Sequence, residues 1–206
     1  MAAAEGPQAA LVVASQKRTF ADLLLDSPQP IPEVVVPFRG PKIVDGEVCI
    51  LFSKEEIENS VLPFRFSIVL KFLRQRPSLD SIRVFIRSRW GLSKQSVVSS
   101  MLKPRNVFIR MSSEEDFIKA LTREATDIDG AIYHVFHWTT EFQEDKEPVK
   151  VPVWISLPGL PPNYYQDSYL RNITAPIGQY LKRDNPTKCA TPTEGARICV
   201  EMDVSK

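Results

Sequence analysis

The chain has 206 residues, of which 43% are hydrophobic, 25% charged and 9% aromatic. These fractions are typical of globular proteins and exclude a fibre, a coiled coil or a chain that is disordered throughout. The length allows one large domain or two small ones. Three cysteines are too few for a disulfide scaffold, which favours a reducing compartment.

No apolar run reaches the roughly 18 residues that span a bilayer. Glu5 stands where a signal peptide has its positively charged region. We therefore expect an intracellular protein, in the nucleus or the cytoplasm, with no membrane partner.

The formal net charge of +1 hides an uneven distribution. Residues 63–142 hold 13 Lys and Arg against 8 Asp and Glu, whereas residues 1–62 hold 5 against 9 and residues 143–206 hold 8 against 8. A polyanion-binding domain requires such a local excess of basic residues. The excess equally fits a solvated surface that happens to be positive, and the sequence leaves both interpretations open.

Residues 1–45 are predicted to form a largely disordered arm, because six prolines in this stretch exclude a long helix or a central strand. Phe20 and the leucines at 23–25 form an apolar cluster within the arm. This cluster is either a docking peptide for a partner or a turn packed against its own domain.

Residues 46–140 are predicted to form the main domain. Apolar periodicity, caps and turn residues give a strand at 47–53, a helical turn at 54–60, a strand at 66–73, a helix from Ser78 to Gly91, strands at 95–102 and 105–111, a helix from a Ser112/Glu115 capping box to about 124, and a strand at 131–138. From 66 onward the order is βαββαβ. This order predicts a four-stranded antiparallel sheet with both helices on one face, the ferredoxin-like arrangement that RNA-recognition modules share.

Residues 141–150 are predicted to be a charged linker, and residues 151–206 a β-α-β subdomain. Its elements are a strand at 151–157, helical residues at 167–183 broken by Pro176, and a strand at 197–204. The last strand has no hairpin partner after it. We therefore expect a half-unit that is truncated or completed by a strand from elsewhere.

The sequence offers little for catalysis or cofactor binding. His134 and His137 lie three positions apart on a predicted strand and therefore point to opposite faces, so they cannot chelate one metal ion together. Neither a glycine-rich phosphate loop nor a nucleophile elbow occurs. We expect a protein that is not an enzyme and has no metal or cofactor.

One face of the predicted sheet suggests binding. If the helices cover the face that carries Ile68 and Leu70, then Lys71, Phe108 and Arg110 share the other face. An exposed phenylalanine beside basic residues can stack on a base while its neighbours neutralise phosphates. The strand lacks the glycines of the RNA-recognition motif, and the rest of the chain could instead cover Phe108. The predicted nucleic-acid-binding residues are Lys71, Arg74, Arg76, Lys103, Arg105, Phe108 and Arg110.

A succession of motifs carries a family resemblance. The motifs are Trp90, the helix start at 113–116, Trp138, the strand at 153–155, the turn at 157–161, the pair at 177–178, Asp184 and the strand at 197–201. In this order they resemble the plant family called domain of unknown function 4283, over about residues 47–206. The resemblance implies a gag-like, nucleic-acid-associated region of retroelement-type proteins, usually upstream of a CCHC zinc knuckle. Residues 123–130 replace the family's usual Pro-Trp pair, so we expect that turn to differ.

We therefore expect a non-enzymatic module that binds single-stranded RNA or DNA with low sequence specificity. The alternative is a protein-interaction or self-assembly domain, a possible homo-oligomer, without direct nucleic-acid contact.

Overall fold

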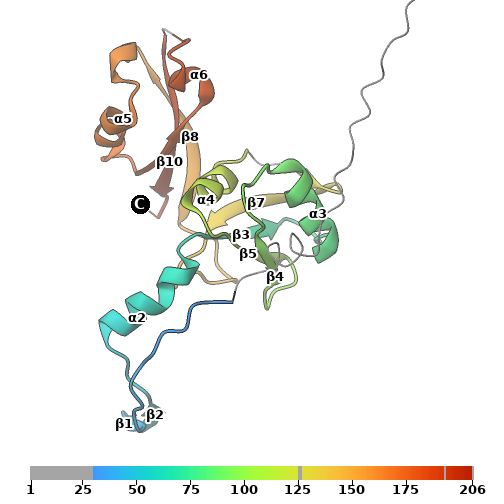
Figure 1. The fold of residues 1–206 in the computed structure, drawn as a ribbon, viewed down its shortest axis with the longest axis vertical. Coiled ribbons are helices and arrows are strands. Elements are labelled where there is room, and N and C mark those ends of the chain that lie inside the picture. The colour runs from blue at the N-terminus through green and yellow to red at the C-terminus, as the bar shows by residue number, and fades with distance from the viewer. Residues whose placement is uncertain (1–29, 125–126, 193, 206) are drawn as a thin grey trace, which may run out of the picture.

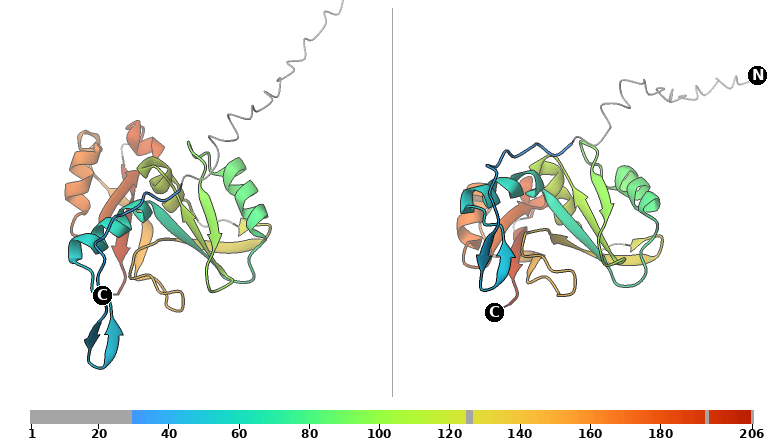
Figure 2. Two further views of the ribbon diagram at one scale, coloured as in Figure 1. Left: turned by 60° about the horizontal axis from the view of Figure 1, so that its bottom comes forward. Right: turned by 90° about the horizontal axis from the view of Figure 1, so that it is seen from below.

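The computed structural model describes residues 30–124, 127–192 and 194–205. Two α+β units lie side by side, and an N-terminal hairpin projects from them (Figures 1 and 2). The first unit is built on a five-stranded sheet and the second on a three-stranded sheet.

The first unit has the predicted βαββαβ order. Its elements are β3 (Ser67–Phe72), α3 (Leu79–Arg89), β4 (Val97–Ser100), β5 (Asn106–Arg110), α4 (Glu114–Leu121), the two-residue β6 (Asp127–Ile128) and β7 (Ala131–His137). All pairs are antiparallel, and the strand order is β4-β5-β3-β7-β6. The predicted fold class, a split βαββαβ sheet, is confirmed; β6 is an additional strand that the sequence pattern did not predict.

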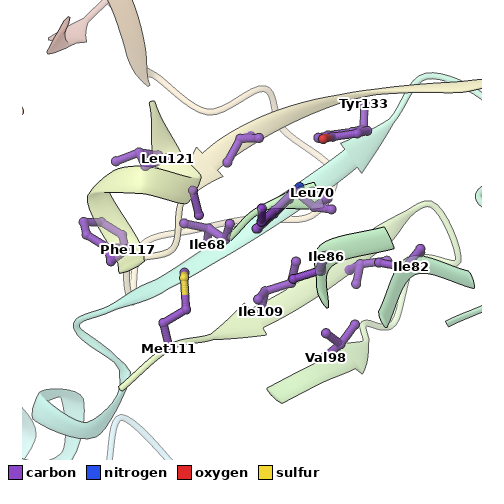
Figure 3. Close-up of a cluster of buried hydrophobic side chains, with 14 of the residues drawn as sticks. Ile68, Leu70, Ile82, Ile86, Val98, Ile109, Met111, Phe117, Leu121 and Tyr133 are labelled. Atoms are coloured by element: carbon purple, nitrogen blue, oxygen red, sulfur yellow. The ribbon is translucent and has the colours of Figure 1, made fainter. Parts of the chain in front are cut away.

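Both helices cover one face of this sheet, as predicted. Ile68, Leu70 and Phe72 of β3 point toward α3 and α4 and are at most 2% exposed. They pack against Ile82 of α3 and Leu121 of α4 in one hydrophobic core (Figure 3). Burial of each such side chain contributes about 1.5–3 kcal/mol, which holds the helices to this face and leaves the opposite face without a helix.

The capping residue of α4 differs from the prediction. The predicted N-cap was Ser112, but Ser113 is the N-cap, and its hydroxyl accepts a hydrogen bond from the Asp116 backbone N–H at 3.2 Å. The helix starts one residue late because Met111, which follows β5, still points into the core and the chain turns only at Ser112.

The last residues of the predicted N-terminal arm are ordered in a hairpin. The predicted arm reaches residue 45, but β1 (Lys42–Val44) pairs with β2 (Glu47–Cys49) across a two-residue turn with positive φ at Asp45 and Gly46. The predicted strand at 47–53 is therefore shorter. The apolar cluster at 20–25 lies outside the described residues.

A short helical segment connects the hairpin to the first unit. It consists of α2 (Lys54–Val61) and the 3-10 turn η1 (Leu62–Phe64). Ser53 and Glu56 form a capping box at the start of α2. The Glu56 carboxylate also binds Arg39 at 2.5 Å, which ties the segment before the hairpin to α2.

The second unit contains β8 (Lys150–Pro158), η2 (Pro162–Tyr164), α5 (Asp167–Thr174), β9 (Gln179–Arg183), α6 (Asn185–Lys188) and β10 (Gly195–Asp203). Two predictions are wrong here. Residues 179–183 form a strand rather than helix, and β10 is the central strand, paired on both sides with β8 and β9 of the same unit, so no strand from elsewhere completes the sheet beside it. Pro176 ends the helical run, and Gly178 then lets the backbone lie against β10, since a Cβ there would come within 2.4 Å of the Glu201 carbonyl oxygen.

The two units pack directly on each other. Trp154 of β8 donates its indole N–H to the Thr122 carbonyl at the end of α4 (3.2 Å), and Arg197 of β10 lies 4.7 Å from the Trp154 ring. Leu181 and Cys199 join the core of the first unit. Residues 138–149 connect β7 to β8 and include most of the predicted linker. The two units that they join are in direct contact.

Candidate nucleic-acid interface

The helix-free face is the side of the five-stranded sheet opposite α3 and α4. Strand register places its side chains in rows. Lys71 of β3 lies between Asn106 of β5 and His134 of β7, and in the next row Val69 lies between Phe108 and Phe136. This face thus carries aromatic side chains in one row and polar or basic side chains in the next. The sequence prediction that Lys71 and Phe108 share this face is confirmed.

Three aromatic rings form a cluster on the helix-free face. The centroid of the Phe108 ring lies 5.5 Å from that of Trp138 and 6.3 Å from that of Phe64 in η1, and the Phe64 and Trp138 centroids are 5.6 Å apart. Val69, next to Phe108, is completely buried. Phe108 is half-buried, so the prediction of an openly exposed ring is only partly correct, because Phe64 and Trp138 cover part of it.

The sequence analysis did not predict a role for the two other rings of this cluster. Trp138 could have been found from strand parity, since it follows His134 and Phe136 at intervals of two. Phe64 carries no such signal, because it lies in the turn before β3 and reaches the sheet only through the tertiary fold.

A hollow of about 290 Å³ lies beside the polar row. Lys71, Lys103 and Arg105 line it, together with Asn106 and His134. The structure therefore brings together three of the predicted nucleic-acid-binding residues, from β3 and from the β4–β5 loop at 101–105.

An acidic segment, residues 144–147, lies against the same hollow. Glu147 contacts the Lys71 ammonium at 3.1 Å, and Asp145 contacts that of Lys103 at 2.8 Å. The hydrogen bond to Asp145 raises the pKa of Lys103. The Glu144 carboxylate accepts hydrogen bonds from the backbone N–H groups of Leu102 and Lys103 and from the side-chain amide of Asn106. In this structure the chain's own carboxylates thus contact the predicted basic residues.

The other predicted residues lie away from the hollow. Arg74 follows β3 on an exposed stretch, and Arg76 donates to the neighbouring Pro77 carbonyl at 2.9 Å. Arg110 lies opposite Ser67 near the far end of β5, two register rows from Asn106. None of the three lines the hollow.

The two histidines lie on opposite faces, as predicted. His134 is exposed on the helix-free face, whereas the His137 ring packs 4.9 Å from Phe117 of α4 and lies 3.3 Å from the Glu201 carboxylate. Within residues 30–124, 127–192 and 194–205, no three His, Cys, Asp or Glu side chains gather as ligands for a metal. In the same ranges, no helix has the length and apolar character needed to cross a membrane.

Residues 60–146 match the family model described as Domain of unknown function (DUF4283). These residues form a DUF4283 domain. The match runs from the end of α2 through β7 into the acidic segment, so it includes the basic residues of the hollow together with Glu144 and Asp145, and it ends one residue before Glu147. No curated protein sequence matches the chain at a significant level.

Among solved structures the chain is similar to a Sxl-lethal protein–RNA complex, with 14% identity, a TM-score of 0.30, and coverage of 68% of this chain and 83% of the other. It is similar to the RNA binding domain of Hrp1 in complex with RNA, with 10% identity, a TM-score of 0.30, and coverage of 66% and 80%. It is also similar to the first two RRM domains of the yeast poly(U) binding protein, with 16% identity, a TM-score of 0.28, and coverage of 68% and 83%.

Proposed function

We propose that the DUF4283 domain is a non-enzymatic module that binds single-stranded RNA or DNA on its helix-free face, with little sequence specificity. One observation carries the proposal: Lys71, Lys103 and Arg105 line one hollow next to the row that holds Phe108. Basic groups beside aromatic rings on a sheet are the combination that binds a strand's phosphates and stacks its bases.

The geometry favours loose recognition. Lysine and arginine contacts to phosphates position a strand but carry no sequence information. Stacking on Phe108 or Trp138 tolerates every base, because every base has a π face. His134, exposed at the edge of the hollow, is a polar side chain that can hydrogen-bond a base or sugar. We therefore expect binding to depend on charge and strand flexibility more than on sequence.

A salt-dependent titration tests the proposal. Three phosphate contacts on a single strand give a log–log salt slope of about −2, so affinity for a fluorescent 20-mer should fall about tenfold between 50 and 150 mM salt. Arg105→Glu should weaken binding by a further tenfold or more. The matched control is Arg89→Glu, an exposed residue of α3 on the helix-covered side, which should change affinity less than twofold. Undetectable binding at micromolar protein, or binding indifferent to salt, would rule the function out.

A second candidate function is protein interaction or self-assembly without nucleic-acid contact. It is favoured by the large apolar side chains of the N-terminal region, which are widely exposed: Phe38 is 99% exposed, Val35 89%, Ile43 77% and Val48 74%. Exposed apolar surface of this extent commonly marks an interaction site. Light scattering at rising protein concentration tests self-assembly, since a constant monomer mass would exclude it.

We extend the first proposal to the biological context that the family resemblance implies, a gag-like protein of a plant retroelement. In that context a CCHC zinc knuckle would add affinity for the same nucleic acid. The coding sequence downstream of Lys206 tests this extension directly, because it either encodes a CCHC motif or does not.

A further inference from the structure

We propose that the β4–β5 loop is a phosphate-binding site, that Glu144 occupies it in the unbound protein, and that the acidic segment 144–147 competes with nucleic acid for the helix-free face. The inference rests on the proposed function, because it names the subsite for a phosphate and the means by which access to it is regulated.

The donors around Glu144 form an anion site. Its Oε2 atom accepts the Lys103 backbone N–H at 2.7 Å and the Asn106 amide at 3.0 Å, while Oε1 accepts the Leu102 N–H at 3.2 Å. Asn106 is only 2% exposed, so its amide is held in place. Successive backbone N–H groups that converge on one point bind carboxylates and phosphates alike, because both present several acceptor oxygens and negative charge.

The neighbouring contacts extend the site beyond one anion. Asp145 pairs with Lys103, and Glu147 pairs with Lys71, which also donates to the Lys146 carbonyl at 3.0 Å. Three carboxylates thus occupy donors from β3, from β5 and from the loop before it. A single phosphate could replace only one of these contacts. A single-stranded nucleic acid carries a phosphate on every nucleotide and can replace several at once.

The segment is held weakly enough to be displaced. The side chains of Asp145 and Glu147 are 76% and 86% exposed, whereas those of their partners Lys103 and Lys71 are 50% and 16% exposed. Water therefore reaches the carboxylate of each pair, and ion pairs open to water on one side contribute little. The anchors on either side, Phe142 and Pro148, are half-buried and can stay in place while the acids between them move. The apparent affinity for nucleic acid is therefore the affinity of the open site multiplied by the fraction of molecules in which the segment has left it.

The test compares two triple variants that remove the same charge. In E144Q/D145N/E147Q the segment loses its carboxylates. In the control E55Q/E58Q/E114Q three exposed acids are neutralised on α2 and at the start of α4, away from the hollow. Fluorescence anisotropy with a labelled 12-nucleotide oligo(U) at 100 mM salt should show affinity about tenfold higher than wild type for the first variant and less than twofold higher for the control.

The outcomes separate the inference from the proposed function. If wild type and both variants bind with equal affinity, or the control gains as much as the test variant, the competition is refuted and nucleic-acid binding stands. If none of the three proteins binds, both fall. If the test variant gains affinity, amide relaxation of 15N-labelled wild type distinguishes displacement from simple repulsion. On saturation with oligo(U), residues 143–147 should become mobile, and an unchanged, ordered segment would overturn the inference.

Discussion

Replacing Asp116 by asparagine should destabilise the DUF4283 domain by about 2 kcal/mol. The Asp116 side chain is 2% exposed and joins the start of α4 to the turn after α3. It accepts hydrogen bonds from the Ser93 backbone N–H and hydroxyl, both at 2.8 Å, and from the Lys94 backbone N–H at 3.1 Å. Bonds to a charged group contribute about 1.5–3 kcal/mol each, and the asparagine NH₂ would face a backbone donor in place of an acceptor.

The pH dependence of stability gives an independent check. Burial alone would raise the pKa of Asp116, but the hydrogen bonds from Ser93 and Lys94 outweigh it and hold the pKa below its usual value. Because the folded-state pKa is depressed, this carboxylate stabilises the fold above the unfolded pKa of about 3.9, and its contribution is lost as the pH falls through the folded pKa. The gap between wild type and Asp116→Asn should therefore be full at pH 7 and shrink below about pH 4.

Urea unfolding followed by circular dichroism at pH 7 and pH 3 measures both effects. Glu115→Gln, an exposed neighbour in the same helical turn, is the control and should change the free energy of unfolding by less than about 0.5 kcal/mol. If Asp116→Asn costs no more than Glu115→Gln at pH 7, the account of this junction is wrong.

One substitution and one labelling experiment test the second unit. Gly178→Ala should lower the melting temperature by several degrees, because the new Cβ would lie 2.4 Å from the Glu201 carbonyl oxygen. The control Gly40→Ala, whose Cβ would have no atom within 4 Å, should leave the melting temperature unchanged. Equal melting temperatures for the two variants would contradict the close approach of Gly178 to β10. Burial raises the pKa of the Cys199 thiol to about 12, so at pH 8 a thiol reagent should label the exposed Cys189 quickly and Cys199 only after unfolding. Rapid labelling of Cys199 in the folded protein would show that the two units do not pack as described.

The main elements of the first unit were predictable because local signals agree with the tertiary fold. The apolar spacing of α3 and its Ser78 cap act locally, and so does the continuous apolar run of strand length at β3, which is buried on both faces. The second unit was harder to predict. Residues 179–183 continue an apolar helical spacing, and only pairing with β10, which lies far along the sequence, makes them a strand. A short apolar run of this kind does not determine its own secondary structure.

The side chains of the candidate site were predictable from the sequence, but the acidic segment that lies against them was not. Strand parity placed Lys71 and Phe108 on one face, because the side-chain period of a strand is fixed. Residues 141–150 show only charge and no apolar period, so the sequence indicated a linker. Whether Glu144 and Glu147 stay in solvent or contact the sheet depends on where the β4–β5 loop places its N–H groups, which no local pattern encodes.

Photo-crosslinking tests the central claim that a single strand lies on the helix-free face. A 5-iodouridine-labelled oligo(U) is bound to the full chain, irradiated and digested with trypsin. The account predicts crosslinks in the peptide Asn106–Arg110, whose only aromatic residue is Phe108, and at Trp138. Crosslinks confined to α3, or to the second unit at 150–205, would contradict it.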